Sequence, residues 1–134
     1  MNMNVILDNQ PLKNQEDINL SNLDKISNGS IQEINCQILD QLKFNDRIST
    51  LIKLLKKIKN GGSLTIKFLD ANKIMKDYSN GKIPSQNLSE LISEMQSLNS
   101  ESDLLEIISD NQHFRILKKY HDNYFLIVVL HKKI

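Results

Sequence analysis

The segment DRISTLIKLLKKIKNGGSLTIKFLD, residues 46–70, changes from helical to strand periodicity at a pair of glycines. Before the glycines, apolar residues recur every three or four positions, as on one face of an amphipathic helix: Ile48, Leu51, Ile52, Leu55 and Ile58. After them, Leu64, Ile66 and Phe68 alternate with polar residues, which is typical of a strand with one buried face. The intervening Asn60-Gly61-Gly62 predicts a left-handed helix stop. A helix that leads directly into a strand favours α/β architectures.

Further strands and helices are predicted on both sides of this unit. The apolar run 5–7 and the segment 30–39 each have strand character and lie next to turn signals. Helical spacing predicts helices at 71–78 and within 84–100 and 100–111. The chain therefore alternates strands with helices over most of its length.

The C-terminal segment predicts a β-hairpin. Two strand-like runs are joined at His121-Asp122-Asn123, and the second run, 124–130, is apolar on both faces, as in a strand covered on both sides. Together with the preceding alternation, this predicts one α/β domain, residues 1–134. Its sheet is expected to be mostly parallel, flanked by helices, and to end in the antiparallel hairpin.

Composition places this domain in an ordinary class. The chain has 134 residues, 40% hydrophobic content and a net charge of +1, so no strong global field attracts nucleic acid or membranes. The single cysteine, Cys36, excludes an internal disulfide and suits a reducing compartment. No apolar run approaches the roughly 20 residues of a membrane span, and the N-terminus does not resemble a signal peptide. We therefore expect a cytoplasmic protein without a membrane partner.

Four short motifs occur in a fixed order between residues 26 and 78. They are Asn28-Gly29-Ser30, Leu39-Asp40-Gln41, Lys59-Asn60-Gly61-Gly62 and Leu69-Asp70. With the terminal hairpin, they resemble the C-terminal half of S-adenosylmethionine-dependent methyltransferases with a Rossmann-like fold. In one branch of that family, an aspartate-glycine-serine turn leads to the fourth strand and a leucine-glutamate-histidine segment follows it. A lysine-proline-glycine-glycine turn then precedes the fifth strand, which closes on proline-aspartate.

The resemblance fails in the half that holds the cofactor. The family binds its cofactor through a glycine-rich loop after the first strand, where backbone N–H groups must approach the ligand closely. All four glycines of this chain lie further on, and Asp8-Asn9-Gln10 occupies the expected loop. The space before the fourth strand is also too short for the usual strands and helices. The predicted fold is thus methyltransferase-like but shortened at its N-terminal half, most simply without a cofactor.

The resemblance also indicates where any remaining cofactor contact would lie. Ligands of open α/β sheets bind beyond the carboxyl ends of the strands. The S-adenosylmethionine-binding candidates at these positions are Asp8, Asn9, Cys36, Gln37 and Asp40. Each also suits a structural role, as a turn or cap residue or, for Cys36, as a small core residue. Asp17 could imitate a ribose-binding acid or simply be exposed.

Other chemistry has weaker support in the sequence. His113, His121 and His131 have no Cys or paired carboxylates to complete a metal site, so no metal is expected. No nucleophile has an identifiable base, so no catalytic residue is assigned. Lysines on the helix before the glycine pair and near the C-terminus could bind phosphates, but aromatic residues are only 5% of the chain. Nucleic acid is therefore only a minor alternative as a partner.

Three functional hypotheses follow. The first is a non-catalytic, methyltransferase-like module that forms oligomers, most simply a homodimer, or binds a protein partner. A shortened sheet favours this hypothesis because it leaves an edge or face that a partner can cover. The alternative is an S-adenosylmethionine-dependent methyltransferase with an abbreviated cofactor site. The third is a small nucleic-acid-binding domain that uses the lysine-rich helix.

Overall fold

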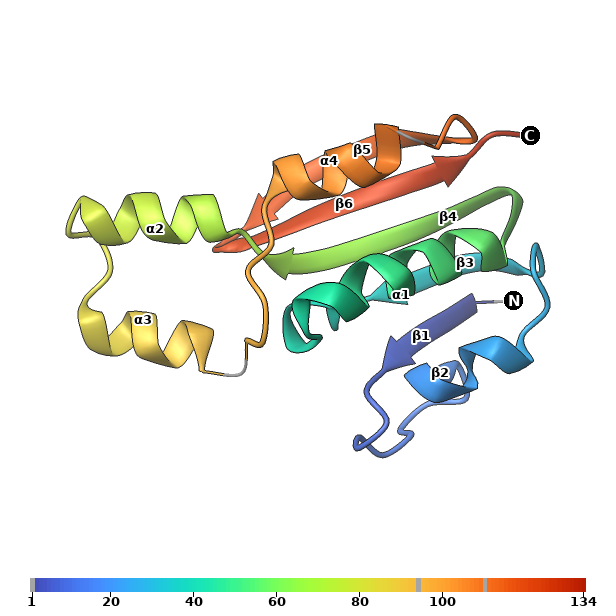
Figure 1. Cartoon of the computed structure of the whole chain (residues 1–134), viewed down its shortest axis with the longest axis horizontal. Coiled ribbons are helices and arrows are strands. Elements are labelled where there is room, and N and C mark those ends of the chain that lie inside the picture. Colours follow the sequence, from blue (N-terminus) through green and yellow to red (C-terminus); the bar gives the residue numbers. More distant parts are fainter. Residues whose placement is uncertain (1, 94, 110) are drawn as a thin grey trace.

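The computed structural model describes residues 2–93, 95–109 and 111–134, and it contains one mixed sheet (Figure 1). Its six strands have the order β2-β1-β3-β4-β6-β5. They span Asn2–Ile6 (β1), Asp17–Asn19 (β2), Ile31–Cys36 (β3), Ile58–Leu69 (β4), Phe114–Asp122 (β5) and Phe125–Lys132 (β6). The pairs β1–β2, β1–β3 and β3–β4 are parallel, whereas β6 is antiparallel to both β4 and β5. The predicted α/β fold with a C-terminal hairpin is confirmed.

Helices lie in the connections between β2 and β3, between β3 and β4, and between β4 and β5. The α-helices are Phe44–Lys57 (α1), Ala71–Ser79 (α2), Ser85–Ile92 (α3) and Glu101–Ser109 (α4), and the short 3-10 helices are Leu20–Lys25 (η1) and Leu39–Gln41 (η2). Because α1 directly precedes β4, the predicted helix–strand unit is present. The helix expected within 84–100 ends earlier than its apolar spacing suggests, at Ile92.

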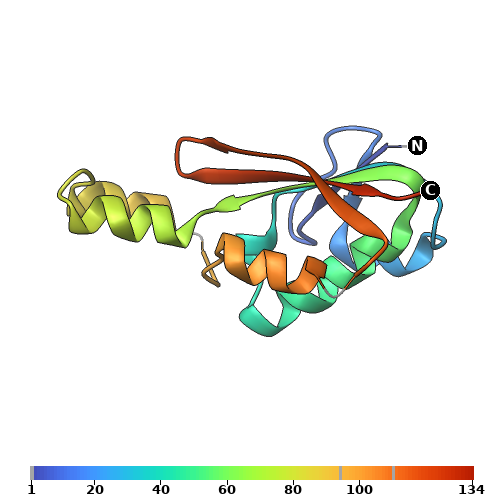
Figure 2. The ribbon, with the colours of Figure 1, turned by 90° about the horizontal axis from the view of Figure 1, so that it is seen from above.

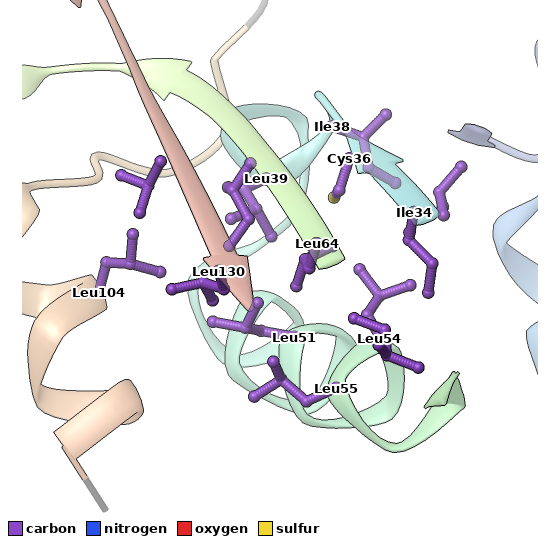
Figure 3. Packing of buried hydrophobic residues seen from close by; sticks show 14 of the residues in the cluster. Ile34, Cys36, Ile38, Leu39, Leu51, Leu54, Leu55, Leu64, Leu104 and Leu130 are labelled. Atoms are coloured by element: carbon purple, nitrogen blue, oxygen red, sulfur yellow. The ribbon is translucent and has the colours of Figure 1, made fainter. Parts of the chain in front are cut away.

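The main core lies between one face of the sheet and the helices η1, α1 and α4, which share that side in Figure 2. Leu51, Leu54 and Leu55 of α1 pack against alternate residues of the central strands, including Ile34 and Leu64 (Figure 3). Leu104 of α4 and Leu130 of β6 extend the same cluster. The periodic residues of the α1–β4 unit therefore build the core as their spacing predicts.

The other face of the sheet has no helix over it in the part of the chain described here (Figure 2). Its residues on β1, β3 and β4 are largely polar, as Asn4, Asn35 and Thr65 illustrate. The expectation that β6 is covered on both sides is therefore wrong. Ile127 of β6 is still only 8% exposed, because side chains of the neighbouring strands, Lys67 and Tyr120, stand on either side of it.

The glycine pair lies inside β4 and does not end a helix. Helix α1 stops at Lys57, and Ile58 already pairs with Ile31 of β3. The next pair is Glu33 with Ser63, so β4 carries extra residues at this point. Gly61 adopts φ +83°, and a Cβ on Gly62 would lie 2.6 Å from the carbonyl oxygen of Gln32. Glycine is needed here for a strand irregularity and a close backbone approach.

Helices α2 and α3 project beyond the carboxyl end of β4 (Figures 1 and 2). Asp70 starts α2, and its side chain accepts hydrogen bonds from the backbone N–H groups of Asn72 and Lys73. A small second core joins these helices to the sheet, formed by Leu69, Ile74 and Ile83. The chain returns to the sheet at Asn99, which forms an isolated parallel bridge with Asp70.

Candidate strand-end site

Two pockets lie where the parallel strands β1, β3 and β4 reach their carboxyl ends. The first, of about 560 Å³, is lined by β1, the loop after it and the end of β3; we call it the strand-end pocket. The second, of about 410 Å³, extends from Gln37 and the end of β4 to α3; we call it the helix-side pocket. Gln37 and Gln41 line both pockets. The two pockets are therefore neighbours on one edge of the sheet.

Asp17 holds the loop that forms one wall of the strand-end pocket. Its carboxylate accepts hydrogen bonds from the backbone N–H groups of Lys13 and Asn14, both at 3.0 Å, and from the side-chain amide of Asn4 at 3.2 Å. These donors, led by Lys13, lower the pKa of Asp17. Asp17 does line the pocket, but its oxygens are used by its own loop. We infer that it shapes the wall and is not a free ribose-binding acid.

Asp8 and Asn9 are exposed and are not among the pocket-lining residues. The Asp8 carboxylate accepts a hydrogen bond of 2.8 Å from the backbone N–H of Ser21, at the start of η1. The neighbouring Gln10 closes a turn, since its N–H donates to the carbonyl of Leu7 at 3.0 Å. The loop therefore forms a turn held by local hydrogen bonds.

Cys36 and Gln37 differ sharply in exposure. The Cys36 side chain is fully buried, at 0% exposure, and burial raises the pKa of its thiol to about 11. A buried neutral thiol of this kind is an inert core group. Gln37, the next residue, is exposed and faces both pockets. Of the five candidate residues, Gln37 is the one that lines the strand-end pocket.

Asp40 lines the helix-side pocket but is bound to the fold. One carboxylate oxygen accepts from the backbone N–H of Leu69 at 2.8 Å, and the other accepts from the side chain of Asn99 at 3.0 Å. Its carbonyl accepts from the N–H of Gln96 at 2.7 Å. Burial raises the pKa of Asp40, and the two donors to its side chain oppose that rise. Asp40 thus joins η2 to the end of β4 and to the segment that returns from α3.

Arg47 is an important buried residue that sequence reasoning missed. Only 6% exposed, it donates from Nη1 to the carbonyl of Leu98 and to the side-chain oxygen of Asn99, the latter at 2.7 Å. Its Nη2 also lies 3.6 Å from the half-exposed carboxylate of Asp103. Through Asn99, Arg47 connects α1 to Asp40. Asp40, one member of this network, also lines the helix-side pocket.

Within the described ranges, no group of three or more potential metal-ligating side chains was found. His121 instead pairs with Asp70, with 2.9 Å between Nε2 and a carboxylate oxygen. The same described residues include no helix whose length and hydropathy would let it span a membrane.

Two lysines of helix α1 are less available for phosphate binding than the sequence indicates. Lys57 is buried, and its ammonium group donates to the carbonyl of Ile26 at 2.6 Å and to the side chain of Asn28 at 3.1 Å. Lys53 pairs with Asp24 of η1 at 3.4 Å. These contacts give two of the lysines structural roles in attaching η1 and the following turn to α1.

No protein-family model and no curated protein sequence matches this chain. Solved structures do match its fold. They include an S-adenosylmethionine-dependent methyltransferase from Thermotoga maritima, with a TM-score of 0.57 and 14% identity. Another, from Archaeoglobus fulgidus, has a TM-score of 0.59 and 9% identity. A third is the plantazolicin methyltransferase BpumL, solved with S-adenosylhomocysteine, with a TM-score of 0.53 and 15% identity.

The matched regions make up most of this chain but a smaller share of each methyltransferase. The matches cover 87%, 87% and 78% of this chain, but only 63%, 67% and 52% of the respective methyltransferases. The chain therefore spans about half to two thirds of these three methyltransferases, and less than half of some other matching structures. It has the methyltransferase-like Rossmann fold in a truncated form.

Proposed function

We propose that this chain binds S-adenosylmethionine in the strand-end pocket and acts as a methyltransferase on an acceptor in the helix-side pocket. The observation that carries the proposal is that Gln37 and Gln41 line both pockets, so a donor and an acceptor would meet at these side chains. The similar structures favour this alternative over a non-catalytic module, because S-adenosylmethionine-dependent methyltransferases recur among them. When bound, the cofactor supplies an electrophilic methyl group on a sulfonium.

The size and polarity of the strand-end pocket fit such a ligand. A volume of about 560 Å³ lies within the usual range of small-molecule sites. Asn35, Gln37 and Gln41 bring amide groups that can donate and accept hydrogen bonds to hydroxyls or a carboxylate. Leu7 and Ile38 supply apolar wall for a purine ring.

One part of the site departs from this fit. The turn at Asp8-Asn9-Gln10 has no glycine, and the Gln10 N–H is already donated to Leu7. Backbone N–H groups in this turn are thus poorly placed to approach a ligand closely. We therefore expect side-chain amides to hold the cofactor, with an affinity weaker than a glycine-rich loop would allow.

Isothermal titration with S-adenosylmethionine and S-adenosylhomocysteine tests this proposal. We expect saturable binding, weakened about fivefold in Gln37→Ala, since one hydrogen bond contributes about 1 kcal/mol. Gln112→Ala is the matched control, because Gln112 is also exposed but lies away from both pockets. If neither ligand gave heat, or if Gln37→Ala and Gln112→Ala bound with equal affinity, the assignment would be contradicted.

A second candidate function is the non-catalytic module that self-associates. The turn without glycine favours it, and so does β5, which is an edge strand of the sheet. On this proposal, light scattering should give the mass of a homodimer over a wide concentration range, while titration with S-adenosylmethionine gives no heat. A strictly monomeric mass at high concentration would exclude it.

A further inference from the structure

We propose that the helix-free face of the sheet, over β4, β6 and β5, binds single-stranded nucleic acid. We call this surface the open sheet face. It is formed by alternate residues of the three strands, which register brings side by side: Thr65, Lys67, Phe125, Ile127, Val129, Arg115, Lys118 and Tyr120. The binding does not rest on the methyltransferase proposal.

Aromatic rings on this face can stack with bases. Tyr120 is opposite Ile127, and Phe125 lies two residues before Ile127 on the same strand, so the two rings are diagonal neighbours on one surface. Tyr120 is 42% exposed, and Phe125 is partly exposed. Stacking on such rings tolerates any base, because every base has a π face.

Positive charge surrounds the rings. The Lys118 ammonium lies 4.7 Å from the centre of the Tyr120 ring, and the Lys67 ammonium lies 4.7 Å from the centre of the Phe125 ring. Arg115, further along β5, is exposed on the same face. Carboxylates also lie on this side of the sheet: Asp122 is directly opposite Phe125 at the hairpin end, whereas Glu33 on β3 and Asp17 on β2 lie outside the three strands of the open sheet face. Cations beside rings provide the phosphate contacts that single-strand binding requires.

A single-stranded nucleic acid suits this surface better than a nucleic-acid duplex or a packing helix does. Duplex bases are already stacked on one another and are not available to Tyr120. A packing helix would need an apolar surface, but Thr65, Lys67 and Lys118 interrupt the apolar residues of the face. In addition, Lys67 and Phe125 line the helix-side pocket, so a nucleic acid bound on this face would reach that pocket.

Fluorescence anisotropy with labelled single strands of about twelve nucleotides, oligouridylate and oligothymidylate, tests the inference without any cofactor. We expect binding at about 50 mM salt. The logarithm of the association constant should fall with the logarithm of the salt concentration at a slope of about −2, as expected for about three phosphate contacts. Tyr120→Ala should weaken binding about tenfold, and Tyr120→Phe should keep it. Binding of RNA and not DNA, or the reverse, would show which sugar is accepted and supports the proposal either way.

Matched controls separate this face from general charge or exposure. Tyr78→Ala removes a similarly exposed tyrosine, at 38%, from α2 and should leave affinity unchanged. Lys118→Gln should weaken binding and lower the salt slope by about 0.7, whereas Lys53→Gln on α1 should change neither. No binding of either oligonucleotide, or equal losses in the Tyr78 and Tyr120 variants, would overturn the proposal.

Photocrosslinking gives a readout that needs no variant. An oligonucleotide carrying a photoreactive uridine should form adducts that mass spectrometry places on peptides containing Tyr120 or Phe125. Adducts confined to α1 would overturn the assignment and point to the lysine-rich helix. Burial of Tyr120 by a second copy of the chain, seen as a dimer that Tyr120→Ala dissociates, would overturn it as well.

Discussion

Gly62→Ala is expected to destabilise the fold by about 3 kcal/mol or more, as measured by urea unfolding. The added methyl group would lie 2.6 Å from the carbonyl oxygen of Gln32 and 2.9 Å from that of Lys59. Both are backbone atoms, so relief requires β4 to move away from β3 and also to change its own backbone conformation between Lys59 and Gly62. The expected cost is therefore much larger than the usual effect of one methyl group.

Gly29→Ala is the matched control for this effect. Gly29 has φ +69°, but a Cβ there would meet nothing within 4 Å. We expect a cost of about 1 kcal/mol from the left-handed backbone alone. Equal losses for the two variants would show that β4 accommodates a side chain at Gly62 and that the close approach is not structurally important.

Arg47→Leu is expected to cost about 3 kcal/mol in the same unfolding experiment. The substitution removes the donor from the buried side-chain oxygen of Asn99 and from the part-buried carbonyl of Leu98. Amide hydrogen exchange should also report it, because the Ala71 N–H donates to the Asn99 carbonyl at 3.0 Å and should lose protection when Asn99 is released.

Asp103→Asn tests the exposed partner of the same arginine. The Asp103 carboxylate is 51% exposed and 3.6 Å from Arg47, so its ion pair is screened by solvent. We expect a change below about 1 kcal/mol. If Asp103→Asn were as damaging as Arg47→Leu, the exposed ion pair, and not the buried hydrogen bonds, would be the source of the stability.

The sequence predicts the parts of this fold that local periodicity encodes. The apolar spacing of α1 and the alternation in β4 identify both elements, because core-facing residues repeat along each of them. The hairpin is also predicted, although its turn falls at Asn123 and Tyr124, slightly later than expected. By contrast, Asn60-Gly61-Gly62 serves equally well as a helix stop or a strand irregularity, and only the register with β3 decides between them.

The candidate site depends on contacts that leave no local pattern. Arg47 binds Asn99, a residue 52 positions away, and its place on α1 looks like an ordinary exposed helix position. Likewise, Lys67 joins Lys118 and Tyr120 on one surface only through the pairing of β4, β6 and β5. The lysines of α1 attract attention in the sequence, yet Lys57 is a buried hydrogen-bond donor.

The segment from Ala71 to Leu98 leaves the sheet at Asp70 and returns at Asn99, and these two residues form a bridge with each other. The excursion thus begins and ends at one point, while the Asp40, Arg47 and Asn99 contacts close the core beneath it. Evolution could exchange such an insertion for another of different length without rebuilding the main core. Since Glu90, Leu91 and Met95 of this segment line the helix-side pocket, its selectivity could change independently of the scaffold.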